Sequence, residues 1–292
     1  MRRRDFIIGG VAAGLASGVL GQSGSSQAPE ENSADQAKLN RLAVMTYCFE
    51  DIIKSVGHPG DPARTLDVLD CPQMIADRYG IHHVTFQHYH FAENSPAYFR
   101  EVRDRMRAAH SKINQICLEF DELNISSPER YVLLETIDLS KTWIDYAAFL
   151  GASSVLINQG TLAPEVRDSA IATLKTIGEY GKSKNVDVNV ENRGEWRILV
   201  EVIKAAGVYA TPDIGNFRDN TERMAGLRVM YAMTSGNSHA HYDPERYNEA
   251  DAINIAKQVG YKGLFSIETG RNNGPDPYAA VMTVRNALLQ II

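Results

Sequence analysis

Residues 186–213 read VDVNVENRGEWRILVEVIKAAGVYATPD and contain a complete strand–helix–strand unit. Two short β-rich runs, residues 186–191 and 209–213, flank a longer amphipathic segment at residues 195–206, which predicts a helix between two strands. Gly207 directly follows the helical segment, where a left-handed C-cap is expected. This order of elements indicates a βαβ unit, in which the two strands are parallel.

The same alternation extends over the chain from Arg41 to its C-terminus. The predicted strands are residues 42–47, 83–87, 113–120, 154–158, 186–191, 209–213, 237–241 and 264–268. The predicted helices are residues 66–79, 97–110, 128–150, 164–184, 195–206, 221–233, 246–259 and 277–289. No composition break divides residues 41–292, so we expect a single-domain α/β protein, a (β/α)8 TIM barrel, rather than an open doubly wound sheet.

The composition is that of an ordinary globular protein, with 44% hydrophobic and 23% charged residues. The 30 Lys and Arg residues are outnumbered by 36 Asp and Glu residues, which gives a formal net charge of −6. This balance provides no basic field of the kind that nucleic-acid binding needs, so we expect no nucleic-acid partner. Three cysteines are too few for a disulfide scaffold or a cysteine-based metal site.

Residues 1–40 have the features of an export signal followed by a flexible polar segment. Residues 3–7, RRDFI, resemble a twin-arginine motif, and the apolar run that follows is too short and too glycine-rich to span a bilayer stably. A Sec signal that happens to be rich in arginine is the alternative. No cysteine follows the apolar run, so no lipid anchor is expected. The sequence therefore predicts a periplasmic protein that uses the twin-arginine (Tat) export machinery and has no stable membrane anchor.

Four consecutive predicted strands, the fifth to the eighth, end in residues that can bind a metal ion. These residues are Glu191, Asp213, one of His239 and His241, and Glu268. In a barrel of parallel strands the C-terminal ends meet at one mouth, where the active sites of this architecture lie. Three carboxylates and one imidazole form an oxygen-rich ligand set that suits one divalent ion, Mn²⁺ first, with Mg²⁺, Co²⁺ or Zn²⁺ as alternatives.

Each of these residues, taken alone, has a structural explanation as an N-cap, a salt-bridge partner or a turn residue. Four of them at the same level of the barrel are harder to explain in that way, because crowded carboxylates repel one another unless a cation neutralises them. We therefore interpret the four strand ends as one metal site.

Four motifs stand at these strand ends: VENRG at 190–194, PDIGNF at 212–217, HAH at 239–241 and GYKGLFSIE at 260–268. Together they resemble the xylose-isomerase-like TIM barrels, the sugar phosphate isomerase/epimerase family. Its members show ENHG, DxGN, a histidine in strand seven and GYxGxxxIE at these places, which implies that Glu191, Asp213, a strand-seven histidine and Glu268 bind the metal. Arg193 stands where the family usually has histidine.

The resemblance leaves two candidates for the histidine ligand. Residues 239 and 241 are two apart, so both side chains point to the same face of a strand. Related ketose epimerases have HxH here and use the second histidine, which favours His241. Other members have HxK, which implies that His239 is the ligand and that His241 takes the place of the lysine.

The resemblance also implies substrate contacts at the opposite rim of the barrel. Many members have a stretch related to QHYHF at residues 87–91 that contacts substrate; His90 aligns with it, whereas His88 fits a surface histidine pair equally well. Glu119 ends the third strand, and Asn158, at the end of the fourth, can hydrogen-bond sugar hydroxyls. The predicted substrate-binding residues are His88, His90, Glu119, Asn158, Arg193 and Arg246.

These features predict a metal-dependent sugar isomerase or epimerase that acts on a ketose or keto-sugar through an enediolate. By the resemblance, the catalytic residues are Glu191 and Glu268, which flank the substrate carbon and exchange its proton. The closest alternative is a lyase or dehydratase that uses the same metal site on a keto-sugar, a 3-keto-glycoside or an inosose. The net charge disfavours an endonuclease IV-like nuclease, and the intact carboxylates disfavour an inactive sugar-binding barrel. The expected substrate is a small carbohydrate, and assembly as a homo-oligomer stays open.

Overall fold

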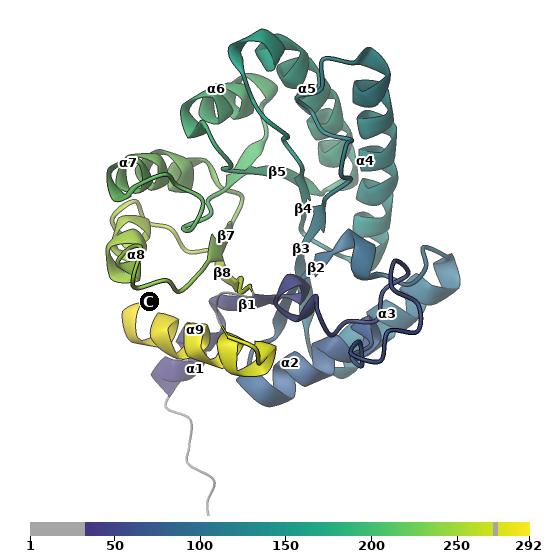
Figure 1. Cartoon of the computed structure of the whole chain (residues 1–292), viewed down its shortest axis with the longest axis vertical. Helices are drawn as coiled ribbons and strands as arrows, with labels where there is room; N and C mark the ends of the chain where they lie inside the picture. Colours follow the sequence, from purple (N-terminus) through teal and green to yellow (C-terminus); the bar gives the residue numbers. More distant parts are fainter. Residues whose placement is uncertain (1–32, 271–273) are drawn as a thin grey trace, which may run out of the picture. The chain divides into compact units, whose positions relative to one another are not determined.

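The computed structural model describes residues 33–270 and 274–292, which form one α/β barrel (Figure 1). Parallel strands lie side by side in the order β6-β5-β4-β3-β2-β1-β8-β7. They are β1 (Leu42–Met45), β2 (His83–Gln87), β3 (Lys112–Leu118), β4 (Ser154–Ile157), β5 (Asp187–Glu191), β6 (Tyr209–Thr211), β7 (Asn237–Ala240) and β8 (Leu264–Ile267). Each predicted strand is present, and the (β/α)8 barrel is confirmed.

Helices surround the strands, as Figure 1 shows. The α-helices are α1 (Ser33–Leu39), α2 (Cys71–Tyr79), α3 (Pro96–Ala108), α4 (Arg130–Leu150), α5 (Arg167–Lys184), α6 (Trp196–Ala206), α7 (Asn220–Met230), α8 (Glu249–Gln258) and α9 (Pro277–Ile291). Short 3-10 helices are η1 (Thr46–Phe49), η2 (Val68–Asp70), η3 (His88–His90), η4 (Pro164–Val166) and η5 (Tyr231–Met233).

The strands are buried on both faces, which explains their content of Val, Ile and Leu. Ile116 of β3 pairs with Val155 of β4, and neither side chain is exposed. Gly151 and Gly207 follow α4 and α6 in the left-handed conformation, with φ values of 78° and 69°. The chain can therefore turn from each helix directly into the next strand, which holds that strand in the barrel.

The folded unit begins earlier than the sequence predicts, at Ser33 rather than at Arg41. Residues Ser33–Leu39 form α1, and Leu39 is only 1% exposed because it packs in the hydrophobic core. Lys38 Nζ donates a hydrogen bond of 2.5 Å to the carbonyl of Leu289 in α9. The boundary expected after residue 40 is therefore corrected, because an apolar anchor ties this segment to the barrel. The predicted export signal lies in residues 1–32, outside the described residues.

A second correction concerns the loop after β7. The sequence predicts a helix from residue 246, whereas α8 begins at Glu249, and the Asn248 side chain caps it by accepting a hydrogen bond from the backbone N of Ala250. Arg246 therefore lies in a turn, where its backbone N bonds the carbonyl of Asp243. Within residues 33–270 and 274–292, no helix is long and apolar enough to cross a membrane.

Strand pairing is interrupted between β6 and β7. These strands are joined by isolated bridges, one of which pairs Asp213 with His239. The backbone N of His239 donates to the carbonyl of Pro212 at 2.9 Å, and the backbone N of Ile214 donates to the carbonyl of His239 at 3.1 Å. Pro212 has no N–H to donate, which explains why β6 is shorter than the predicted strand.

Candidate metal centre and active site

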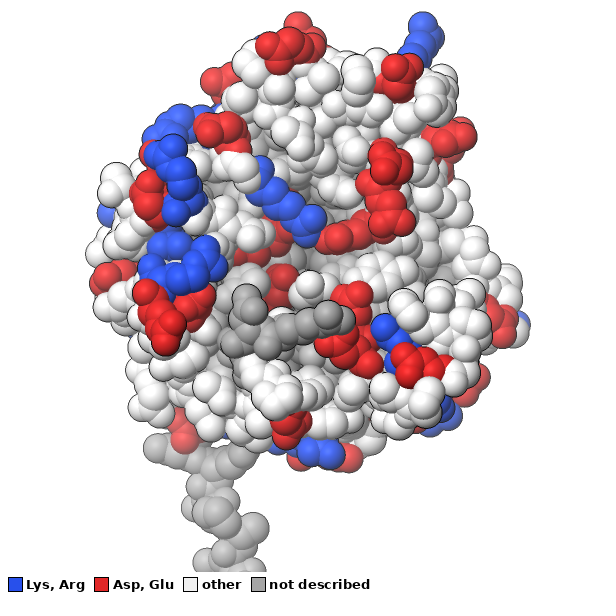
Figure 2. All heavy atoms as spheres, in the orientation of Figure 1, with Lys and Arg blue, Asp and Glu red and all other residues white. Residues whose placement is uncertain are grey.

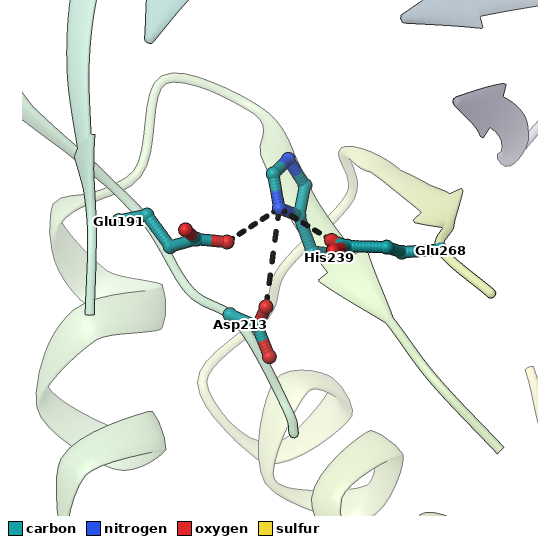
Figure 3. A group of neighbouring side chains, drawn as sticks. All are labelled: Glu191, Asp213, His239 and Glu268. Atoms are coloured by element: carbon teal, nitrogen blue, oxygen red, sulfur yellow. Dashed lines mark hydrogen bonds and ion pairs between the residues drawn. The ribbon is translucent and has the colours of Figure 1, made fainter. Parts of the chain in front are cut away.

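Three acidic side chains and one imidazole converge at the C-terminal ends of the strands (Figure 3). Glu191 is the last residue of β5, and Glu268 directly follows β8. His239 lies in β7, and Asp213 lies two residues after β6. Because the ends of parallel barrel strands meet, residues far apart in the sequence become neighbours here. Figure 2 shows acidic side chains in and around the central hollow of the barrel.

The four side chains lie close enough to share one metal ion. Their ligand atoms all lie within 4.8 Å of one another. His239 Nδ1 lies 2.7 Å from Glu191 Oε1, 3.1 Å from Glu268 Oε2 and 4.0 Å from Asp213 Oδ2. Two ligand atoms that each lie about 2.0–2.6 Å from one ion can be at most twice that distance apart. The separations in this cluster meet that limit.

The chemistry of this cluster fits a divalent cation. Glu191 and Asp213 are buried, so their charges are largely removed from water. Burying carboxylates side by side is costly unless a cation compensates them. Glu268 Oε2 is also buried and, within the described residues, accepts no hydrogen bond, although it lies against His239. A metal ion would satisfy this oxygen.

Asp213 is held in place by the turn that follows it. Its Oδ1 accepts hydrogen bonds from the backbone N of Gly215 at 2.5 Å and of Asn216 at 3.0 Å. The side-chain amide of Asn192 bonds both the backbone N and the carbonyl of Asp213. A Cβ on Gly215 would lie 2.9 Å from His241 Cδ2, so glycine is what lets the turn approach the histidine this closely.

His241 lies beside the cluster, with its Nε2 3.0 Å from Asp213 Oδ2 and 3.6 Å from Glu268 Oε2. Burial disfavours its charged form, but Asp213 and Glu268 outweigh burial and raise the pKa of His241 to about 9. The pKa of His239 is likewise raised against burial, mainly by Glu191. Burial raises the pKa of Asp213 to about 6. In the metal-free protein the two imidazoles therefore supply positive charge that the carboxylates require.

Arg193 links Glu191 to a further carboxylate. Its Nε donates to Glu191 Oε2 at 2.8 Å, and its Nη2 donates to Glu119 Oε1 at 2.5 Å. Burial alone would raise the pKa of Glu191, but His239 and Arg193 outweigh it and hold that pKa well below its usual range. Both oxygens of Glu191 are thus engaged, Oε1 by His239 and Oε2 by Arg193.

An open cavity of about 620 Å³ adjoins the cluster on the side of β7 and β8. Its lining includes Tyr47, His241, Arg246, Tyr247 and Glu268. On the side of β3 to β5, the bridge from Glu119 through Arg193 to Glu191 narrows the space so that, within the described residues, it admits no water-sized molecule. Of these two sides, the β7–β8 side is therefore the one with room for a small molecule in the described part of the chain.

Sequence comparison now assigns the chain to a family. Residues 75–287 match the family described as xylose isomerase-like TIM barrel. The chain belongs to this family. The resemblance inferred from the four motifs is thereby confirmed. No curated protein matches the chain.

Solved structures share the fold of this xylose isomerase-like barrel. A xylose isomerase-like TIM barrel protein from Mycobacterium smegmatis in complex with magnesium has a TM-score of 0.65 and 18% identity, covering 87% of this chain and 97% of that one. D-allulose 3-epimerase from Methylomonas sp. has a TM-score of 0.69 and 10% identity, covering 87% and 98%. D-psicose 3-epimerase from Clostridium cellulolyticum H10, solved with D-tagatose, has a TM-score of 0.64 and 12% identity, covering 85% and 94%. At these identities the likeness shows the fold.

In this family member, the predicted substrate-binding residues lie in different places. Arg246 lines the open cavity, with its guanidinium 3.6 Å from Asp243. Glu119 and Arg193 lie in the ion-pair bridge on the opposite side. Asn158 Oδ1 accepts a hydrogen bond of 3.1 Å from the backbone N of Gly160, so this amide helps to shape a turn.

His88 and His90 lie in η3, after β2, and neither lines the open cavity. The His88 ring packs edge-on against Trp143, and its Nδ1 accepts a hydrogen bond from the backbone N of Glu119. His90 is 1% exposed and contacts Thr46 Oγ1 through Nδ1 at 2.9 Å, while its Nε2 has no partner within the described residues. Burial lowers the pKa of His88 to about 4 and that of His90 to about 3, so both are neutral at pH 7.

Two further residues at the site escape prediction from the sequence. Tyr247 lines the cavity, and its hydroxyl is buried without a hydrogen-bond partner in the described part of the chain. Gln115 of β3 places its Oε1 3.2 Å from His239 Nε2. No motif accompanies Tyr247. For Gln115 the available signal is the polar pair Asn114 and Gln115 inside a strand that is otherwise largely apolar, because a buried amide needs a partner.

Proposed function

We propose that this protein is a metal-dependent isomerase or epimerase of ketoses or keto-sugars. The observation that carries the proposal is the convergence of Glu191, Asp213, His239 and Glu268, whose ligand atoms lie within 4.8 Å of one another. Membership of the xylose isomerase-like family supports it, and so do structural neighbours that are named as 3-epimerases.

The four converging residues would hold the ion. His239 is favoured over His241 because its Nδ1 faces all three carboxylates, whereas His241 Nε2 lies near Asp213 and Glu268. The oxygen-rich donor set favours Mn²⁺, with Mg²⁺, Co²⁺ and Zn²⁺ as alternatives. When bound, such an ion polarises the carbonyl oxygen of a sugar and so acidifies the neighbouring C–H bond.

Glu268 is the residue best placed to move the proton. Its side chain is 17% exposed and lines the open cavity, so a substrate can reach it. Its pairing differs from that of Glu191, since no guanidinium neutralises it within the described residues. A carboxylate is a competent base for a C–H group only where that carbon is acidified and water is excluded. Arg246 and the Tyr247 hydroxyl would bind sugar oxygens from the cavity wall.

A lyase or dehydratase that acts at the same site is the second candidate, and Arg193 is the observation that favours it. Epimerisation removes a proton from one face of a carbon and returns one to the other face, so two free acid–base groups serve it best. Here Arg193 engages Oε2 of Glu191, and the proposed ion would take its Oε1. Elimination of a β-leaving group from a keto-sugar, a 3-keto-glycoside or an inosose needs only one base, which is Glu268.

Proton exchange in D₂O tests both candidates. The protein is stripped of metal, reconstituted with Mn²⁺ and incubated with D-fructose, D-tagatose and methyl 3-keto-α-D-glucoside while proton NMR spectra are recorded. A new epimer that carries deuterium at the inverted carbon supports the epimerase, and release of methanol from the glycoside supports the lyase. The absence of any Mn²⁺-dependent exchange or release from these compounds would contradict both.

We further propose that residues 1–40 direct export of the folded protein through the twin-arginine machinery to the periplasm. The support is the RRDFI motif and the apolar run after it. Folding before export lets the cytoplasm load a weakly competing ion such as Mn²⁺, because tighter-binding metals would otherwise take the site.

A further inference from the structure

Strand β3 contains an irregularity next to Gln115, which contacts His239 of the metal cluster. Val84 of β2 pairs with Ile113, but the next residue of β2, Thr85, pairs with Gln115. Asn114 is therefore an extra residue in β3, which makes this a β-bulge. Bulges next to active sites commonly redirect a side chain.

The bulge turns two consecutive polar side chains into the barrel interior, although neighbours in a regular strand point to opposite faces. Asn114 Nδ2 donates hydrogen bonds to Thr85 Oγ1 at 2.9 Å and to Asn237 Oδ1 at 2.9 Å. The next residue, Gln115, is fully buried and places its amide between Thr211 and His239. The bulge thus brings Gln115 to the far side of the imidazole.

The two nitrogens of His239 face different surroundings. Nδ1 faces Glu191, Glu268 and Asp213, whereas Nε2 lies 3.2 Å from Gln115 Oε1. The Gln115 amide also contacts Thr211, because its Nε2 donates to Thr211 Oγ1 at 3.0 Å. The carbonyl oxygen of Gln115 meets His239 Nε2, and the buried Cys117 side chain is a further hydrogen-bond partner of His239.

A neutral imidazole carries one proton, and the nitrogen without it is the one that can bind a metal ion. A hydrogen bond from the outer nitrogen to a fixed acceptor sets the tautomer and the ring orientation of a metal-binding histidine. We propose that Gln115 is a positioning residue that keeps the proton of His239 on Nε2 and so presents the Nδ1 lone pair to the ion. This inference rests on the metal site of the proposed function and on no particular sugar.

Metal affinity tests the inference without substrate. Titration of the full chain with Mn²⁺, followed by electron paramagnetic resonance, gives Kd for the parent, Gln115→Leu and Gln115→Glu. We expect Gln115→Leu to raise Kd by about 10- to 100-fold. Gln115→Glu retains an acceptor at this place and should restore most of the affinity. A merely space-filling role instead predicts that Gln115→Leu, which keeps a side chain of similar size, leaves Kd unchanged.

Asn114→Ala is the matched control, because Asn114 belongs to the same bulge but bonds Thr85, Asn237 and Ser266 rather than His239. It should lower thermal stability and leave Kd for Mn²⁺ within about threefold of the parent, since no ligand loses its acceptor. If Gln115→Leu fails to fold, Thr211→Val replaces it, because that change releases the Gln115 amide and should also raise Kd.

Nitrogen-15 spectra of histidine in the Mg²⁺-loaded protein supply a second readout. The parent should show the His239 proton on Nε2, and Gln115→Leu should show weakened or mixed protonation of the two nitrogens. Unchanged Kd and unchanged spectra in folded Gln115→Leu would overturn this inference but not the proposed function. An equal loss of affinity in Asn114→Ala would do the same. A parent protein that binds no divalent ion would instead overturn the proposed function together with it.

Discussion

Arg193 Nε lies 2.8 Å from Glu191 Oε2, so a fixed positive charge touches one of the candidate metal ligands. The same guanidinium reaches Glu119, which follows β3. Arg193 therefore partly neutralises the acidic cluster and joins the ends of β3 and β5. Arg193 stands where the ENHG motif of the resemblance has histidine, so this ion pair departs from that motif.

Replacing Arg193 by glutamine should tighten Mn²⁺ binding, because the change removes a cation that repels the ion. We expect Kd to fall by about three- to tenfold at low ionic strength, and the difference to shrink as NaCl is added. A Mn²⁺ titration measures it. Arg193→Lys retains the charge and is the matched control. Equal Kd values for the two variants would show that the charge of Arg193 does not act on the ion.

Replacing Glu268 by glutamine should slow substrate proton exchange by about 10²- to 10⁴-fold, because the amide cannot accept the proton. Deuterium incorporation at saturating Mn²⁺ measures the rate, so weaker ion binding does not obscure the result. Glu245→Gln is the matched control, since Glu245 lines the same cavity. If the two variants exchanged protons equally fast, Glu268 would not be the base.

Replacing Gly215 by alanine should weaken Mn²⁺ binding by about tenfold or more, because misplaced support of a metal ligand costs this much. The new Cβ would lie 2.9 Å from His241 Cδ2 and 3.3 Å from Asp213 Oδ1, so these side chains must move. Isothermal titration calorimetry measures the affinity. Gly57→Ala, whose Cβ would meet nothing within 4 Å, should bind Mn²⁺ like the parent. Parent-like binding by Gly215→Ala would exclude such crowding.

Acid should destabilise the protein through His90. Burial lowers the pKa of His90 from 6.5 to about 3, so between these values the unfolded chain binds a proton that the folded chain does not. The free energy of unfolding should therefore fall by up to about 1.4 kcal/mol for each pH unit below 6.5 from this residue. Urea unfolding at pH 7 and pH 5 measures the difference, which His90→Gln should reduce. An unchanged difference in His90→Gln would assign the acid sensitivity to other groups.

Residues 1–40 fused to a folded reporter should carry it out of the cytoplasm in a manner that depends on Arg3 and Arg4. The twin-arginine route reads the arginine pair, so replacing both by lysine should abolish export, as measured by cell fractionation. Replacing Arg2 alone should leave export intact. Unchanged export of the double lysine variant would point to the Sec route instead.

The fold follows from the sequence because its signals are local and repeated. Buried runs such as Val186–Glu191 and the glycine stops after helices set each element and its end. The start of the folded unit at Ser33 is harder to predict from the sequence. Helix α1 is short and polar, and it depends on Leu39 packing against residues that are distant in the chain. Contacts of that kind are tertiary, and no local pattern encodes them.

The metal cluster is predictable for a similar reason, because strand topology alone brings Glu191, Asp213 and Glu268 to one mouth. The sequence does not decide between His239 and His241, since both side chains point to the same face of the strand. Which of them faces all three carboxylates depends on the three-dimensional positions of those carboxylates. Gln115 escapes prediction because its role depends on a bulge that shifts the register by one residue.

The interrupted pairing between β6 and β7 gives the proposed ion a second consequence. Asp213 and His239 lie on the two sides of that junction, so an ion bound by both would bridge strands whose backbones are joined by isolated bridges. Backbone amides near the junction should then exchange with D₂O more slowly in the Mn²⁺-loaded protein than in the metal-free protein. Binding of the ion would thus also slow local opening of the barrel between β6 and β7. In the metal-free protein, this junction would be the part of the sheet that separates most readily.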